Sequence, residues 1–456
     1  MTYDYLQLDK SAAVPLYRQL YLCIRKAVES GHLQKGDRLP SVRRLAGDLA
    51  LSCTTVEAAY QQLCVEGYIR SSPQRGYFAL NAKRDGPERE PAPLAFRRAP
   101  SLPVRYNFGS DCVDIGNIDI KIWRRNVRAA LNRQNVLASY GDHQGEPELR
   151  EALSSYSYGA RGVVAQPGQI VVGAGTQPLL SILCGLMGPE RRSVAMEEPG
   201  FPQAEQVFTD SGISVRKLPC DENGIRMDAL EQSGARLAYV SPSNRVRTGS
   251  GIPMSRRMEL LNWAARTGGV IMEDDYNGEL RYRARPVPAM QGIAGGRGVV
   301  YLGSFSKLLL PSVRIGYMAL TPELLTRYLP RAANYNQTAS KVEQFALAEY
   351  IRSGQMERHL RRLRKLYGAK SETLILALRR AFGSRAEILL QETPLTLILT
   401  IHTEKSAAEL CRLALESGVR VQQTKDGRLR LGFAGIPLND IGDAVRCLKD
   451  AWSGII

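Results

Sequence analysis

The sequence has four histidines, no C-x-x-C pair among its eight cysteines and no long apolar run. This composition offers neither a metal-ligand spacing nor a disulfide framework, so we expect no metal site and thiols that stay reduced. No stretch approaches the roughly 18 consecutive apolar residues that a membrane-spanning helix needs. The N-terminus has no basic region followed by an apolar core, which predicts no secretory signal and a cytoplasmic location.

At 456 residues the chain is too long for one ordinary hydrophobic core, and its length favours two or three domains. The net charge of +16 and the pI of about 9.5 fit a polyanionic partner such as nucleic acid, although many basic proteins bind no DNA. Residues 1–80 hold ten Lys and Arg against seven Asp and Glu, a net of +3, so +13 of the charge lies beyond them. We therefore expect a basic surface on the rest of the chain, either as a second DNA contact or as an ordinary solvated surface.

Residues 15–80 predict a small separate unit. Apolar side chains recur at helical spacing over residues 16–28, between a proline and a glycine that can start and stop a helix. Ser41 can cap a second helix, and Ser52 or Thr54 can cap a third one. The stretch YIRSSPQRGYFAL then predicts two short strands about a turn. This pattern favours a winged helix whose third helix fits the major groove of double-stranded DNA, and a plain three-helix bundle is the alternative.

The stretch GDRLPSVRRLAGDLALSCTTVEAAYQQLCVEGYI resembles the signature of the GntR family of DNA-binding domains along its whole length. The resemblance implies DNA contacts from the start of the second helix, from the first turn of the third helix and from the wing: Arg43, Arg44, Thr54, Thr55, Arg75 and Gly76. Arginine suits phosphates and the minor groove, and threonine hydroxyls can reach base edges or phosphates. The family commonly has arginine where Cys53 stands and often where Glu57 stands, so this third helix is less basic than usual.

Residues 81–106 are rich in proline and charge and show no apolar periodicity. They predict a semi-extended tether between two domains. The expected organisation is a winged helix over residues 1–80, this linker, and a large domain over residues 107–456.

In the large domain, strand-like runs alternate with longer amphipathic stretches. The runs are QIVVGA, RSVAMEE, RLAYVSP, GVIMEDD and GVVYLGS. Such alternation predicts an α/β domain with a parallel sheet wrapped by helices. Ligands bind at the carboxyl ends of strands in these sheets, so the residues that follow each run are candidates for a site.

Those strand ends meet the needs of pyridoxal phosphate, which requires a lysine amine, a carboxylate beside its pyridine nitrogen and donors around its phosphate. Lys307 provides the amine as the catalytic residue, and Asp274 the carboxylate. The phosphate donors would be Thr176, Gln177, Ser304 and Arg314. Each feature alone is common, since Gly-rich turns, acidic strand ends and surface lysines have ordinary structural roles. A Rossmann nucleotide site is the alternative, but no G-x-G-x-x-G occurs in the first strand turn of the domain.

Residues 107–450 are similar to fold type I aminotransferases in the segments SFSKLLLPSVRIG, YGDHQGEPELREAL and EDDY. A GntR winged helix joined to such a domain resembles the MocR subfamily of transcriptional regulators. The resemblance implies a homodimer, a ring-stacking role for Phe201 and a hydrogen bond from Tyr276 to the cofactor hydroxyl. It also implies that Arg430 faces the carboxylate of an amino-acid ligand, which the bidentate guanidinium suits.

The loop SPSNRVRTGSG departs from the family pattern. Val246 and Arg247 stand where aminotransferases carry asparagine and proline, and Asn244 lies two residues too early. The roles of Asn244 and Arg247 in cofactor binding are therefore left unassigned. The segment EDDYNGEL also replaces the usual EDDYDSEF, whereas Lys307, Asp274 and Arg314 are retained.

The leading hypothesis is a transcriptional regulator that binds pyridoxal phosphate through Lys307 and uses it as a sensor. The effector would be an amino acid, an amine or pyridoxal phosphate itself, and it would bias DNA binding through the tether. The first alternative is a working aminotransferase with an incidental N-terminal domain. The second is a repressor whose large domain is a cofactor-free scaffold for dimerisation.

Overall fold

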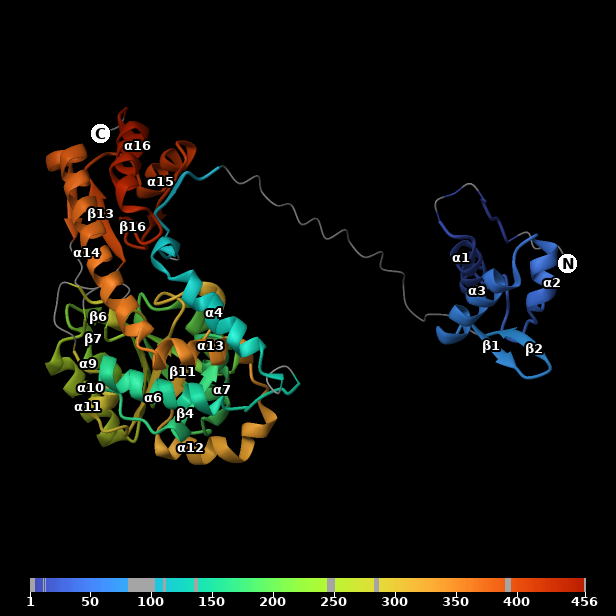
Figure 1. Cartoon of the computed structure of the whole chain (residues 1–456), viewed down its shortest axis with the longest axis horizontal. Helices are drawn as coiled ribbons and strands as arrows, with labels where there is room; N and C mark the ends of the chain where they lie inside the picture. The colour runs from blue at the N-terminus through green and yellow to red at the C-terminus, as the bar shows by residue number, and fades with distance from the viewer. Residues whose placement is uncertain are drawn as a thin grey trace. The chain divides into compact units, whose positions relative to one another are not determined.

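The computed structural model describes residues 5–10, 12, 14–80, 103–109, 112–134, 138–243, 251–282, 287–389 and 395–454. Figure 1 shows the two compact units into which the chain divides, residues 1–99 and 100–456. Most of the predicted linker, residues 81–102, lies outside the described residues. Asn244, Val246 and Arg247 of the altered loop lie outside them as well.

The N-terminal unit is a winged helix, as the sequence predicts (Figure 1). It consists of α1 (Leu16–Glu29), α2 (Val42–Asp48), α3 (Cys53–Val65), β1 (Ile69–Ser72) and β2 (Gly76–Ala79). Ser41 caps α2 by accepting a hydrogen bond from the backbone N–H of Arg44, and Ser52 caps α3 in the same way. These short polar side chains accept hydrogen bonds from backbone N–H groups at the helix starts, and this explains why α2 and α3 begin where they do.

Tyr60 joins α3 to the wing and to the turn before α2. Its hydroxyl donates to the Pro40 carbonyl at 3.0 Å, and its ring lies edge-on against Tyr77 of β2, with 4.7 Å between the ring centroids. The side chain is fully buried in a core that all three helices share. The packing of Tyr60 thus fixes the position of α3 relative to the wing formed by β1 and β2.

An eight-stranded sheet forms the centre of the larger unit, in the order β4-β11-β10-β9-β8-β5-β6-β7. The strands are β4 (Ile170–Gly173), β5 (Ser193–Glu198), β6 (Ser214–Asp221), β7 (Gly224–Ile225), β8 (Leu237–Val240), β9 (Val270–Asp274), β10 (Val299–Ser304) and β11 (Gly316–Ala319). All five strand-like runs of the sequence are strands of this sheet. The prediction of a parallel sheet was wrong in one respect, because β11 runs antiparallel to β4 and β10, and β7 to β6. A parallel return needs a crossover, usually a helix, and the segments that precede β7 and β11 contain no α-helix.

Helices cover both faces of this sheet (Figure 1). One face is buried by α7 (Thr176–Leu186), α8 (Pro202–Asp210) and α12 (Pro322–Tyr328). The other face is buried by α6 (Pro147–Arg161), α9 (Met227–Gln232), α10 (Met254–Thr267), α11 (Met290–Ile293), α13 (Lys341–Arg352) and α14 (Gln355–Phe382). The helix α4 (Ile120–Leu131) packs on α13.

A smaller four-stranded sheet follows the long helix α14. It has the order β12-β13-β16-β15 and consists of β12 (Ala386–Leu389), β13 (Thr396–Ile401), β15 (Gln422–Gln423) and β16 (Leu429–Gly432). The helices α15 (Ala407–Glu416) and α16 (Ile441–Trp452) pack beside it. A short parallel pair, β3 (Tyr106–Asn107) with β14 (Val419–Arg420), attaches the segment after the linker to this part of the chain.

Within the described part of the chain, no helix has both the length and the apolar content to cross a membrane. A search of the same residues finds no group of three His, Cys, Asp or Glu side chains that could hold a metal ion. All eight cysteines are free thiols.

Candidate cofactor site and nucleic-acid interface

The cofactor residues predicted from the sequence gather at one edge of the central sheet. Asp274 ends β9, and Ser304 ends the neighbouring strand β10, whose Leu302 pairs with Asp274. Thr176 and Gln177 open α7 directly after β4. The carboxyl ends of β4, β9 and β10 point to the same edge, so these side chains lie along one edge of the sheet.

The antiparallel strand β11 brings Arg314 to this edge. Because β11 lies between β4 and β10 and runs against them, Arg314, two residues before its start, stands at their carboxyl ends. Arg314 adopts a left-handed backbone conformation, with φ of 51°, and its Nη2 donates to the Ala174 carbonyl at 3.1 Å. The guanidinium is thus placed beside the turn that opens α7.

Gly175 allows this close approach. It has φ of +93°, and a Cβ at this position would lie 3.1 Å from Arg314 Nη2. Gly175 also precedes the first turn of α7, whose backbone N–H groups have no partner within the helix. The guanidinium and these N–H groups together form a cradle for an anion.

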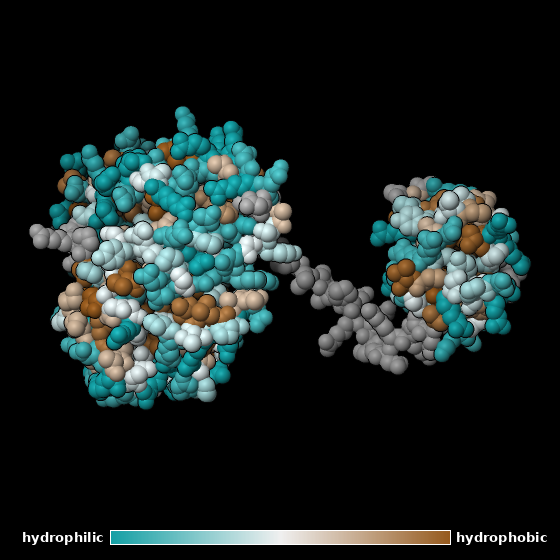
Figure 2. All heavy atoms as spheres, turned by 60° about the horizontal axis from the view of Figure 1, so that its bottom comes forward, coloured by the Kyte–Doolittle hydropathy of each residue, from teal (hydrophilic) through white to brown (hydrophobic). Residues whose placement is uncertain are grey.

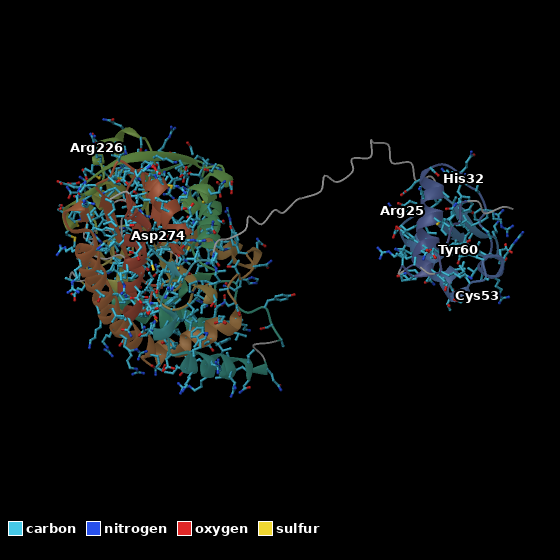
Figure 3. All side chains as sticks on the ribbon, turned by 90° about the horizontal axis from the view of Figure 1, so that it is seen from above. Arg25, His32, Cys53, Tyr60, Arg226 and Asp274 are labelled. Carbon is cyan, nitrogen blue, oxygen red and sulfur yellow. The ribbon has the colours of Figure 1, made fainter. Side chains whose placement is uncertain are left out.

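Asp274 is a buried carboxylate on the face of the sheet that α7 and α8 cover. Its side chain lies near the middle of the larger unit (Figure 3), and only 5% of the residue is exposed. Burial raises the pKa of Asp274 to about 6, a hydrogen bond from Tyr239 lowers it, and the neighbouring Asp275 charge raises it. Such a carboxylate gains strongly from a cation placed beside it.

Tyr239 of β8 is a site residue that the sequence reasoning missed. Its hydroxyl donates to Oδ2 of Asp274, which leaves Oδ1 as the oxygen that can face a ligand. Leu237 and Tyr239 lie on the same face of β8, which packs against α8. The Tyr239 ring contacts Phe208 there. The period of two along RLAYVSP, together with the strand order, would have placed this hydroxyl next to Asp274.

Lys307 lies in the turn after β10 and is half-buried. Its neighbours Phe305, Leu308 and Leu309 are each 1% exposed, so the turn is anchored by apolar packing. The backbone N–H of Ser306 donates to the Ser304 hydroxyl at 3.3 Å, which stabilises the turn further. The lysine therefore projects from a rigid segment.

Phe201, Tyr276 and Arg430 come from three separate elements. Phe201 is half-buried at the start of α8 and packs against the core that contains Tyr239. Burial and the charges of Asp274 and Glu197 raise the pKa of Tyr276, and the Arg430 charge lowers it. The charge of Arg430, on β16 of the smaller sheet, therefore affects the same hydroxyl, that of Tyr276, as the charge of Asp274.

A buried ion pair supports the segment after β9. Arg161 Nε lies 2.5 Å from Asp275 Oδ2, which also accepts a hydrogen bond from Tyr301 at 2.9 Å. Burial alone would raise the pKa of Asp275, but the Arg161 charge and hydrogen bonds from Arg161, Ser243 and Tyr301 hold it below its usual range. The sequence reasoning missed this pair, because its members are 114 residues apart and no local pattern joins them.

Gly278 leaves room for that ion pair. A Cβ at this position would lie 2.3 Å from Asp275 Oδ1 and 2.9 Å from Arg161 Nε. The departure EDDYNGEL, which has glycine where the family pattern has serine, therefore fits the arrangement of charges in this chain.

The predicted DNA contacts lie on the surface of the winged helix. Arg43, Arg44 and Arg75 are exposed, and Arg44 forms an ion pair of 3.8 Å with Asp48.

At the start of α3, the hydroxyls of Thr54 and Thr55 each lie 2.8 Å from the Ser52 hydroxyl. Gly76 opens β2 beside Arg75. Figure 3 shows Cys53 in this same turn, where the GntR pattern has an arginine.

Two protein families match the chain. The family described as aminotransferase class I and II matches residues 112–448, and the family described as bacterial regulatory proteins, gntR family, matches residues 16–78. Together they cover both units of the structure.

The chain is also similar to whole regulators of this kind. It is 35% identical to the uncharacterized HTH-type transcriptional regulator YdeL of Bacillus subtilis (strain 168), over 98% of this chain and 98% of YdeL. It is 31% identical to the probable rhizopine catabolism regulatory protein MocR of Rhizobium meliloti, over 98% of this chain and 96% of MocR.

Among solved structures, the chain resembles LysN, an alpha-aminoadipate aminotransferase from Thermus thermophilus complexed with N-(5'-phosphopyridoxyl)-L-leucine. The TM-score is 0.67 and the identity 25%, over 76% of this chain and 92% of LysN. The likeness extends over the larger unit and confirms the predicted aminotransferase fold.

Replacing Gly278 with alanine should lower the free energy of unfolding by about 1–3 kcal/mol, because the new methyl group would overlap the Arg161–Asp275 ion pair. Gly159→Ala is the matched control, since a Cβ there meets nothing within 4 Å and alanine favours the helix α6. Denaturant unfolding followed by tryptophan fluorescence reports the larger unit, which holds all three tryptophans. Equal stability of the two variants would contradict the role assigned to Gly278.

Proposed function

The chain belongs to the MocR subfamily of GntR-type transcriptional regulators, and on this premise we propose that its larger unit binds pyridoxal phosphate and uses it as a sensor. The observation that carries this proposal is Asp274, a buried carboxylate with one oxygen bound by Tyr239 and the other able to face a ligand. A carboxylate in this position suits the protonated nitrogen of a pyridine ring.

The donor set around Asp274 fits this cofactor. The Arg314 guanidinium and the N-terminal N–H groups of α7 form an anion cradle on one side, which suits a phosphate. Lys307 stands after the neighbouring strand β10, where its amine would meet the aldehyde. When bound, pyridoxal phosphate supplies an aldehyde that reacts with primary amines and a ring that withdraws electrons.

Each residue of the proposed site has a separate role in binding the cofactor. Asp274 would hold a proton on the ring nitrogen, and Tyr239 fixes the orientation of that carboxylate. Phe201 would stack on the ring, and Tyr276 would donate to its hydroxyl group. Thr176, Gln177 and Ser304 would donate to the phosphate, as their positions at the strand ends predict.

The effector would be an amino acid, an amine or pyridoxal phosphate itself. Arg430 comes from the smaller sheet and lies close enough to Tyr276 for its charge to lower the pKa of that hydroxyl. A carboxylate held by Arg430 would therefore link the smaller sheet to the cofactor site. The effector can change the affinity for DNA only if it binds two conformations of the protein with different affinity.

A working aminotransferase is the second candidate function. It is supported by the effect of the Arg430 charge on Tyr276, which suits a residue that binds a carboxylate close by, and by the likeness to LysN. Steady multiple turnover of an amino acid with a keto acid would favour the enzyme, whereas a single turnover or none would favour the sensor.

The proposed homodimer follows from the fold type I resemblance and is supported by exposed groups on the larger unit. Tyr140 is fully exposed, and Arg314 of the anion cradle is exposed as well. Figure 2 shows hydrophobic side chains gathered between hydrophilic zones on one face of the larger unit. Exposed apolar surface of this kind is typical of an interface between subunits.

Reduction with borohydride after incubation with pyridoxal phosphate should fix a pyridoxyl mass on Lys307. The variant Lys307→Ala should gain no such mass, because the amine that meets the aldehyde is gone. Lys405→Ala, which removes an exposed lysine before α15, is the control and should be labelled like the wild type. Peptide mass spectrometry identifies the modified residue, and labelling spread over several lysines would contradict a specific site.

The affinity for pyridoxal phosphate should fall as the pH decreases through about 6, because Asp274 then takes up a proton and can no longer pair with the ring nitrogen. Asp274→Asn, which can still accept the Tyr239 hydrogen bond, should bind about ten- to a hundredfold more weakly near neutral pH. Titrations of both proteins with pyridoxal phosphate, at several pH values from acid to neutral, measure the difference in affinity. The cofactor phosphate titrates equally in both, so identical profiles would exclude Asp274 as the ring partner.

Arg43→Ala and Arg75→Ala should each weaken binding to duplex DNA from the region beside the chain's own gene. The removal of one cation that touches a phosphate should also reduce the slope of log affinity against log salt by about 1. Arg18→Ala removes one exposed arginine from α1 and is the control with the same change of charge. Fluorescence anisotropy at several salt concentrations measures these slopes, and equal slopes for all three variants would contradict the predicted interface.

A further inference from the structure

The helix α4 carries four exposed cations on one face. They are Lys121, Arg124, Arg125 and Arg128, at the spacing i, i+3, i+4, i+7. The helix contains no acidic residue, and Trp123, Asn126 and Ala130 form its buried face. Like charges at this spacing repel one another and destabilise a helix. A partner of opposite charge would relieve that repulsion.

The first half of α14 repeats the same pattern. Arg358, Arg361, Arg362 and Lys365 are exposed at the same spacing. The opposite face of this half is buried through Met356, His359, Leu360 and Leu363. A second cationic stripe thus lies on a second helix of the same unit.

Tyr350 of α13 connects the two helices. Its ring lies 5.9 Å from that of Trp123 on α4 and 6.4 Å from that of His359 on α14. Burial raises the pKa of the Tyr350 hydroxyl, the charges of Arg362 and Arg358 lower it, and the charge of Asp119, which caps α4, raises it. The first half of α14 therefore lies close to the α13 residue against which α4 packs, and Figure 1 shows α4 and α14 on either side of α13.

These cations have few partners in the chain itself. Among the residues that the structure describes, no hydrogen bond or ion pair is made by the side chains of Lys121, Arg124, Arg125, Arg128, Arg361, Arg362 and Lys365. Some exposed cations elsewhere in the unit have acidic partners, as in the pairs Arg226–Asp228, Arg266–Glu231 and Arg412–Glu416. The repeated spacing of the cations and the shared packing on Tyr350 define α4 and the first half of α14 as one basic surface, hereafter the α4/α14 surface.

We propose that the α4/α14 surface binds the phosphate backbone of double-stranded DNA next to the site that the winged helix reads. The proposal rests on the proposed function, because it takes DNA as the ligand of the N-terminal unit. The four cations of α4 span about 10 Å along the helix axis, and duplex DNA carries one charge per roughly 1.7 Å, so several phosphates are within reach.

Charge decides between DNA and a second copy of the chain as the occupant. A twofold axis through this surface would bring the same cations of two copies together, which costs electrostatic energy. Most of the net charge, +13 of +16, lies beyond residue 80, so the winged helix alone does not explain why the chain is basic. Phosphate contacts by α4 and α14 would add affinity without sequence preference.

The test compares two full-length variants with the wild type. One carries Lys121→Gln, Arg124→Gln, Arg125→Gln and Arg128→Gln. The control carries Lys217→Gln, Arg226→Gln, Arg236→Gln and Arg266→Gln, which removes the same charge from exposed positions elsewhere on the larger unit. Figure 3 shows Arg226 at the edge of that unit. Each protein is titrated with a short duplex that covers only the winged-helix site and with one extended on both sides.

The α4 variant should bind the extended duplex more weakly than the wild type and the short duplex equally well. Its salt slope on the extended duplex, measured between about 50 and 200 mM, should be smaller by about 0.9 for each phosphate that the variant no longer neutralises. The control should keep the wild-type slope. A variant with Arg361→Gln, Arg362→Gln and Lys365→Gln repeats the test on α14 if the α4 variant unfolds.

Three results would overturn the proposal. An unchanged slope in a folded α4 variant would exclude contact with DNA, and an equal decrease of affinity in the control would show a general effect of charge. A change in sedimentation of the α4 variant, without a change in DNA affinity, would assign the surface to a protein interface. Failure of the wild type to bind any duplex would instead refute DNA binding by the regulator, and this inference with it.

Discussion

The larger unit depends on the burial of three consecutive acidic side chains at the end of β9. Glu273 accepts hydrogen bonds from the backbone N–H groups of Met290 and Gln291, at 2.8 and 2.9 Å, and Asp275 is paired with Arg161. The alternation of a strand sends these two carboxylates to one face and Asp274 to the other, toward α7 and α8. Asp274 is thereby the carboxylate of the three that faces the proposed cofactor site. The other two hold the strand end in place.

Much of this arrangement follows from local sequence. Strand-like runs, helix caps at Ser41 and Ser52, and an isolated Lys307 after a strand depend on neighbours in the chain, so their patterns are readable. The relation between Tyr239 and Asp274 depends on strand order, and the Arg161–Asp275 pair joins residues 114 apart. Such contacts are set by tertiary packing, which no short stretch of sequence encodes. The strand β11 was not among the predicted strand-like runs, and its antiparallel direction could not be predicted locally, because a strand's direction leaves no mark on its own residues.

That missed direction bears on the site itself. With a parallel β11, Arg314 would stand at the opposite edge of the sheet, away from Lys307 and the N-terminus of α7. The predicted grouping of lysine, carboxylate and guanidinium was therefore inconsistent with a purely parallel sheet, and it rested on the geometry that the family resemblance implies. The structure removes this inconsistency, since one antiparallel strand places Arg314 between the ends of β4 and β10.

The long helix α14 joins the two regions that a sensor must couple. Its first half, where the α4/α14 surface lies, packs against α13 and the segment after β10, and its end leads into the smaller sheet that carries Arg430. A ligand carboxylate that holds Arg430 near Tyr276 would restrain the smaller sheet relative to the central one. Because α14 is continuous over 28 residues, such a restraint would act on the helix as a whole. Coupling between ligand and DNA would then need no contact between the two units, only two positions of α14 that bind DNA with different affinity.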